Sequence, residues 1–175
     1  MPQAQISQLC WLLEEAFDQG DEHSLLANLR DVDDDLANRA LTEGGRSIAE
    51  MIRHVGYFKH VYQSCAFGNG SKPENGPSRD SHGRFSLEEL LAWTREGHRL
   101  LVDSVSALED SELEQPRKVH WGDLLPTRSI VRIMIEHDLY HAGEVNHLRA
   151  VLQGNDEWGL FRGTRVDEGA SRHRP

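Results

Sequence analysis

Apolar residues recur every three or four positions in four stretches of the chain, the spacing that gives an α-helix one buried face. The stretches cover roughly residues 4–19, 47–67, 86–108 and 127–153. No segment alternates apolar and polar residues for long enough to predict a β-strand. Four amphipathic helices without a sheet must bury their apolar faces against one another. The pattern therefore predicts an all-α protein with the architecture of a four-helix bundle.

Residues that start and stop helices stand at the ends of these stretches. Ser47 is followed three positions later by Glu50, a capping box in which each side chain bonds the other residue's backbone N–H. Ser86 and Glu89 repeat this spacing before the third stretch. Three of the four stretches end at a glycine, which terminates helices well: Gly20, Gly68 and Gly154.

Two irregular connections separate the predicted helices. Residues 21–46 are acidic, and we interpret the run at 31–35 as a solvated loop because it lacks the regular spacing of a Ca²⁺ site. Residues 68–85 are rich in Gly, Ser, Pro and Asn and are long enough to span a 20-residue helix. This connection permits an up-down-down-up bundle in which helices two and three run parallel, although a hairpin is also compatible. It is either a flexible crossover or a lid over one end of the bundle.

Composition narrows the class of protein. The 175 residues are enough for one domain, which we place at residues 1–161, followed by a polar tail at 162–175. The 29 acidic and 19 basic residues leave a net charge of −10, which argues against nucleic acid as a partner. No run is apolar and long enough to span a membrane, we expect no secretory leader, and Cys10 and Cys65 form no disulfide framework. We expect a cytoplasmic protein that acts on a small molecule.

The ten histidines are the unusual feature of the composition. His137 and His141 are four residues apart, so they lie one above the other on one helix face. At about 100° per residue, that face also carries Ile130, Met134 and Leu148. His54 falls within the apolar stripe of the second helix by the same construction. Three inward histidines from two helices predict one divalent metal ion, and zinc sites with only three protein ligands are typically catalytic.

Other polar residues on these faces are candidates for supporting roles. Glu144, one turn beyond His141, is either a proton-transfer group that also orients His141 or a charge at the bundle edge. His98 on the third helix is a fourth ligand, an acid–base group or an ordinary core histidine. Glu50, one turn before His54, either acts on that histidine as Glu144 does on His141 or only caps the helix. Tyr140 flanks the histidine pair and either reaches substrate or packs.

These segments resemble the DinB-like superfamily of metal-binding four-helix bundles. The resemblance rests on S-I-A-E-M-I-R-H at residues 47–54 and on E-H-D-L-Y-H-A-G-E-V at residues 136–145. The second motif is the more specific one: two histidines four apart, followed by glycine, an acid and an aliphatic residue. Trp121-Gly122-Asp123 is also similar, and the resemblance covers roughly residues 4–160.

The resemblance implies an up-down-down-up bundle that holds a divalent metal, most often zinc or nickel, through His54, His137 and His141. It also implies relatives that use a low-molecular-weight thiol, such as thiol S-transferases and a maleylpyruvate isomerase, and others described as metal-dependent hydrolases. We therefore expect a metal-dependent hydrolase or thiol-dependent transferase, with Glu144 or His98 moving protons. The alternatives are a metal-binding or stress-related binding protein without turnover, and a bundle whose inward histidines bond one another.

Three apolar residues fall away from the predicted core faces. They are Trp11, Trp93 and Leu139. Large apolar residues that gather on one surface mark association sites, and indole is favoured at the centres of interfaces. Together with the prevalence of symmetric dimers, this predicts a homodimer. The alternative is that the irregular segment 21–46 or the tail covers them.

Overall fold

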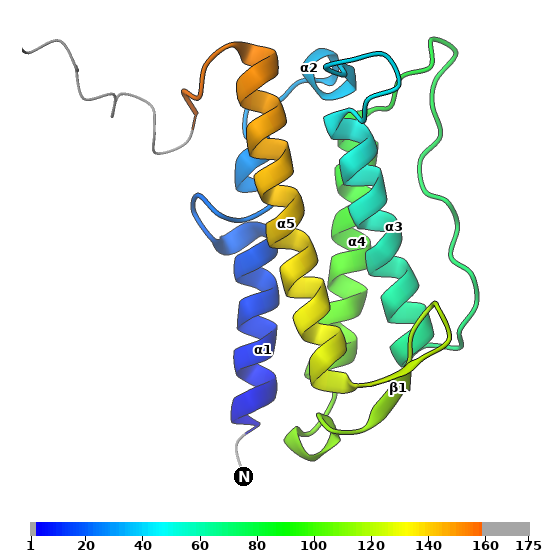
Figure 1. Cartoon of the computed structure of the whole chain (residues 1–175). Coiled ribbons are helices and arrows are strands. Elements are labelled where there is room, and N and C mark those ends of the chain that lie inside the picture. The colour runs from blue at the N-terminus through cyan, green and yellow to red at the C-terminus, as the bar shows by residue number, and fades with distance from the viewer. Residues whose placement is uncertain (1–2, 159–175) are drawn as a thin grey trace, which may run out of the picture.

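The computed structural model describes residues 3–158 and is mostly helical (Figure 1). Its long helices are α1 (Ala4–Glu14), α3 (Ile48–Phe67), α4 (Leu87–Ser106) and α5 (Thr127–Gln153). The shorter ones are the π-helical turn η1 (Glu15–Gln19), η2 (Ala27–Leu29), α2 (Asp34–Asn38) and η3 (Asp110–Glu112). The predicted tail, 162–175, and the boundary at residue 161 lie outside the described residues.

The four long helices lie side by side, with α1 and α5 running in one direction and α3 and α4 in the other (Figure 1). Their starts follow the local sequence. The Ser47 hydroxyl accepts a hydrogen bond from the Glu50 backbone N–H at 3.2 Å, and Glu50 Oε2 accepts one from the Ser47 N–H at 2.9 Å. This confirms the predicted capping box. Within the described residues, no helix is both long and apolar enough to cross a membrane.

The prediction of an all-α protein is wrong in one place, because a small antiparallel hairpin precedes α5. Strand β1 (Pro116–Lys118) pairs with β2 (Leu124–Pro126), with Arg117 opposite Leu125. Three-residue strands are too short to show a period of two, so the pattern of apolar residues misses them. The hairpin turn places the His120 ring 5.3 Å from that of Tyr62 on α3.

The connection between α3 and α4 returns along the outside of the two helices and is held in place (Figure 1). Arg79 pairs with Glu50, and its guanidinium lies 4.4 Å from the Phe85 ring. Trp93 packs beneath Gly76, where an added Cβ would come within 2.6 Å of the indole. The segment is therefore a crossover pinned to α3 and α4.

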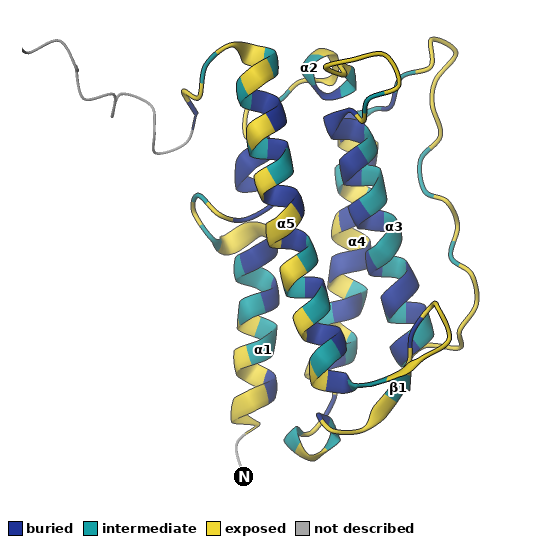
Figure 2. Ribbon diagram, viewed as in Figure 1, coloured by how far each residue is buried: buried dark blue, intermediate teal, exposed yellow. Residues whose placement is uncertain are grey.

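Buried residues form two apolar clusters along the bundle axis (Figure 2). One cluster includes Val55 of α3 and Leu90 of α4, and the other includes Tyr62 and Leu101 of the same helices. Buried polar side chains lie between the two levels: Lys59, Thr94, His98 and Asp138. The candidate site adjoins this polar layer.

Candidate metal centre

Three histidines from two helices meet beside the polar layer. His54 comes from α3, and His137 and His141 come from α5. One ring nitrogen from each lies within 4.8 Å of those of the other two, and Nε2 of His54 is 3.3 Å from Nε2 of His137. The structure thus brings together the three residues that the sequence selects as ligands.

The histidines occupy the edge of the buried faces rather than their centres. His141 is 4% exposed, whereas His54 and His137 are half-buried. Val151, which helical spacing places on the same face of α5 as His137, is 49% exposed. The buried face of α5 is rotated by about one residue toward Asp138. This leaves His54 and His137 partly exposed, while His141 stays buried.

Burial keeps these imidazoles neutral at pH 7. Desolvation, and then the neighbouring charge of His141, lower the pKa of His54 to about 4. Desolvation and the other two histidines lower the pKa of His137 to about 3. Desolvation also lowers the pKa of His141, and Glu144 opposes this shift. Neutral imidazoles carry the lone pairs that a metal ion needs.

The donor set fits a divalent transition metal. Three imidazole nitrogens are suited to zinc or nickel, and ions such as Mg²⁺ and Ca²⁺ prefer oxygen ligands. Nδ1 of His137 is buried without a hydrogen-bond partner among the described residues, so it does not tether the ring as the second nitrogen of a ligand histidine often does. The 3.3 Å distance between Nε2 of His54 and Nε2 of His137 is also compatible with a hydrogen bond in which the N–H of one ring donates to the other ring's nitrogen.

Glu144 contacts the group directly. Its Oε2 lies 2.6 Å from Nδ1 of His141, and its side chain is 32% exposed. This contact favours the tautomer of His141 with a proton on Nδ1, leaving Nε2 free as an acceptor. Glu50 instead caps α3 and pairs with Arg79, in agreement with its capping interpretation.

His98 lies apart from the three histidines. Its ring stacks on Phe17 at 4.0 Å, and Nδ1 is 3.1 Å from Nζ of Lys59. Desolvation and the Lys59 charge lower the pKa of His98 to about 2, so it is a neutral core histidine near pH 7. Tyr140 is 65% exposed, with its ring edge-on to His141 at 5.1 Å.

Lys59 and Asp138 form a fully buried pair that was not predicted from the sequence, with Nζ 2.6 Å from Oδ2. Desolvation lowers the pKa of Lys59 and raises that of Asp138, and each charge opposes the shift of the other. A signal was present: the buried positions Ile52, Val55 and Tyr62 continue through residue 59 at helical spacing. Because charged side chains are almost never fully buried unless paired, Lys59 was expected to be exposed.

Aromatic rings line the site on the side of the hairpin. The Phe58 ring lies 4.7 Å from that of His54 and 5.8 Å from that of His137. The His120 ring lies 5.2 Å from Phe58, and Trp121 follows at 4.7 Å from His120. His120 is not among the residues selected from the sequence, because the hairpin that positions its ring was not predicted.

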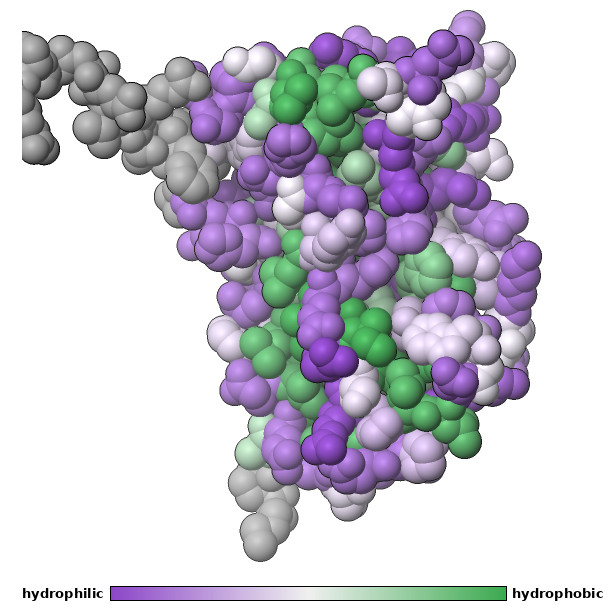
Figure 3. All heavy atoms as spheres, in the orientation of Figure 1, coloured by the Kyte–Doolittle hydropathy of each residue, from purple (hydrophilic) through white to green (hydrophobic). Residues whose placement is uncertain are grey.

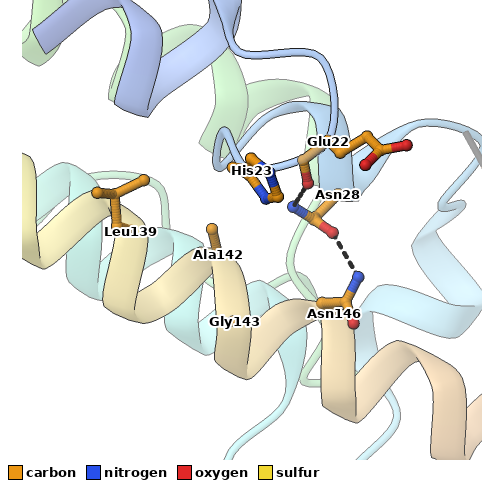
Figure 4. A pocket seen from close by; sticks show the side chains of 7 residues that line it. All are labelled: Glu22, His23, Asn28, Leu139, Ala142, Gly143 and Asn146. Atoms are coloured by element: carbon orange, nitrogen blue, oxygen red, sulfur yellow. Dashed lines mark hydrogen bonds between the residues drawn. The ribbon is translucent and has the colours of Figure 1, made fainter. Parts of the chain in front are cut away.

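A hollow of about 700 Å³ lies on a different face of α5 (Figure 4). Leu139, Gly143 and Asn146 form its floor, and His23 and Asn28 face them from the segment after η1. These α5 positions lie roughly opposite His137 and His141 on the helix. The hollow is therefore separate from the histidine group.

Comparison with known families identifies the chain's relatives. The sequence profile of the DinB superfamily matches residues 18–145. The chain belongs to the DinB superfamily. The match includes all three histidines and Glu144, which confirms the resemblance seen in the two motifs. A search of curated proteins found no match to this DinB-superfamily protein.

Proposed function

We propose that this DinB-superfamily protein is a metal-dependent enzyme whose His54, His137 and His141 hold one divalent ion, zinc or nickel. The observation that carries the proposal is the meeting of three neutral imidazoles, from two helices, within 4.8 Å. Family membership supports it as well. In this proposal the four long helices form the up-down-down-up bundle of the superfamily, with the histidines between α3 and α5.

The bound ion would supply a Lewis-acidic centre that makes water or a low-molecular-weight thiol available in its deprotonated form near pH 7. The chain's own residues supply the rest. Glu144 orients His141 and, being partly exposed, accepts or returns a proton at its carboxylate. Phe58 and the hairpin residues shield one side of the site from water. The reaction is a hydrolysis or the transfer of a group to a thiol.

The alternative is a binding protein that holds the ion without turnover. A fourth protein ligand would favour it. His98 is the sequence's candidate for that role, and its contacts with Lys59 and Phe17 weigh against the alternative.

The test begins with elemental analysis of protein purified without a nickel column. About one equivalent of zinc or nickel is expected. A screen of the loaded protein with ester substrates, and with thiol plus electrophile, then separates hydrolase from transferase. A protein that recovers no divalent metal, even after incubation with an excess of each, contradicts the proposal.

A further inference from the structure

Buried polar side chains from α3, α4 and α5 meet around Lys59. Nζ of Lys59 on α3 lies 2.6 Å from Oδ2 of Asp138 on α5 and 3.1 Å from Nδ1 of His98 on α4. Nε2 of His98 in turn lies 3.4 Å from Oε2 of Glu14 on α1. The ammonium group also lies 4.5 Å from the centre of the Phe17 ring. The hydrogen-bond contacts of Lys59 thus connect α3, α4 and α5 at one level, whereas Nε2 of His98 has no hydrogen-bond partner among the described residues and the partly exposed Glu14 only lies near it.

Stability alone does not account for this arrangement. Desolvating a lysine and an aspartate costs several kcal/mol per ion, and well-packed apolar residues at such a pair are often equally stable or better. The carboxylate is not even fully satisfied, because Oδ1 of Asp138 is buried without a hydrogen-bond partner among residues 3–158. The attested use of such a pair is to select one arrangement of the helices around it.

The pair lies next to the histidines in both helices that supply them. Asp138 directly follows His137 and is one turn before His141, and Lys59 lies five residues after His54. The Lys59–Asp138 bond and the His54–His137 contact therefore tie the same two helices, at positions five residues apart on α3 and adjacent on α5. A metal site tolerates deviations of only about 0.2 Å in its ligand distances.

From this placement we infer that, given the metal site proposed above, Lys59 and Asp138 are positioning residues: their hydrogen bond sets α5 against α3 so that the three imidazoles converge on one point. No other described ion pair joins α3 to α5. The pair acts through helix placement and does not touch the ion.

Two double variants separate placement from charge. Lys59→Gln, Asp138→Asn is neutral but keeps a hydrogen bond across the helices. Lys59→Met, Asp138→Leu is neutral and apolar and has none. The matched control is Arg132→Gln, Glu136→Gln, which removes an exposed pair lying wholly within α5, next to His137 in sequence.

The readouts are zinc affinity by chelator competition, the visible spectrum of the cobalt(II)-loaded protein, which reports ligand geometry, and Tm without metal. The apolar pair is expected to keep a Tm near that of the native chain but to lose zinc affinity about tenfold or more, with an altered cobalt spectrum. The amide pair and the control are expected to stay near native in affinity and spectrum.

Native affinity and spectrum in the apolar pair overturn the inference. A loss in the amide pair as large as in the apolar pair also overturns it, because charge would then be responsible. Should the apolar pair fail to fold, Lys59→Gln, Asp138→Ala replaces it, since residue 59 keeps His98 as a partner while the bond to α5 is lost. If the native chain itself binds no metal, the proposed function fails. If the native chain binds metal and the apolar pair binds it with the same affinity and spectrum, only the positioning role fails.

Discussion

The carboxylate of Glu144 lies 2.6 Å from Nδ1 of His141, one turn away on the same face of α5. A carboxylate in this position fixes the orientation of a ligand imidazole and increases its basicity. Replacing Glu144 with Gln should therefore lower zinc affinity about tenfold or more while leaving the fold intact. Chelator competition measures the change. Glu136→Gln, an exposed acid on the same helix, is the control and should bind zinc as the native chain does.

Removing a ligand should have a larger effect. His141→Ala should lose most of the bound metal and the increase in Tm that metal gives, because an ion that binds only the folded state stabilises it. Elemental analysis and thermal unfolding with and without zinc measure both. The control is His147→Ala, an exposed histidine on the same helix. Stoichiometric metal in the His141 variant would refute the three-histidine assignment.

Acid should weaken both the metal site and the metal-free fold. The pKa of His54 is about 4 and that of His137 about 3 in the folded chain, against about 6.5 in the unfolded chain. Between these values the unfolded state binds more protons, so the free energy of unfolding falls as pH drops below about 6.5. Urea titrations of chelator-treated protein from pH 7 to pH 4 test this. Because the folded pKa values keep the imidazoles neutral at pH 5, metal should be retained there and lost as the pH falls below about 4, and full retention at pH 3 would count against histidine ligands.

Two helix glycines should respond in opposite directions to alanine. A Cβ at Gly56 of α3 would lie 2.5 Å from Oγ1 of Thr94 and 2.8 Å from the Trp93 ring. Gly56→Ala should therefore cost about 1–3 kcal/mol by overpacking the contact with α4. A Cβ at Gly143 meets nothing within 4 Å, and Gly143→Ala should stabilise α5 by about 0.5–1 kcal/mol. Urea denaturation measures both, and a stable Gly56 variant would contradict the close approach.

The homodimer stays a prediction. The exposed apolar surface that would form its interface is smaller than the sequence suggests. Trp93 is half-buried, stacked on His60 and covered by Gly76, which leaves Trp11 at 51% and Leu139 at 44% exposed. The face over α5 is largely hydrophilic with separate apolar areas (Figure 3). Light scattering at micromolar concentration should give a dimeric mass that Trp11→Glu, Leu139→Glu reduces. A monomeric native chain ends the idea.

The sequence predicts the long helices and the histidine group because both follow from local regularities. Helical spacing and the Ser47 cap define α3, and two histidines four apart define one face of α5. The exact rotation of each helix depends instead on all its neighbours. On α3 the apolar stripe through Phe58 and Cys65 competes with one through Val55 and Tyr62, and packing selects the second. That rotation of about one residue buries Lys59 and moves His54 to the edge.

Contacts between distant segments also escaped prediction. The His120 ring reaches Phe58 only because a hairpin with three-residue strands folds its turn back onto α3. The crossover is ordered by Arg79 and Arg84, whose partners Glu50 and Asp35 are 29 and 49 residues away in sequence. Charges of either sign are common in loops, so neither pairing has a local signature.

The parallel arrangement of α3 and α4 has a consequence for how the chain folds. Parallel neighbours cannot form by closing a short hairpin, so residues 68–86 must return along the full length of α3 before the two helices pack. Closure entropy grows only with the logarithm of loop length, so this return costs about 1.4 kcal/mol more than a four-residue turn. The equilibrium penalty is small, but the search for the contact is longer. Folding speed, more than stability, should therefore be sensitive to insertions in the crossover.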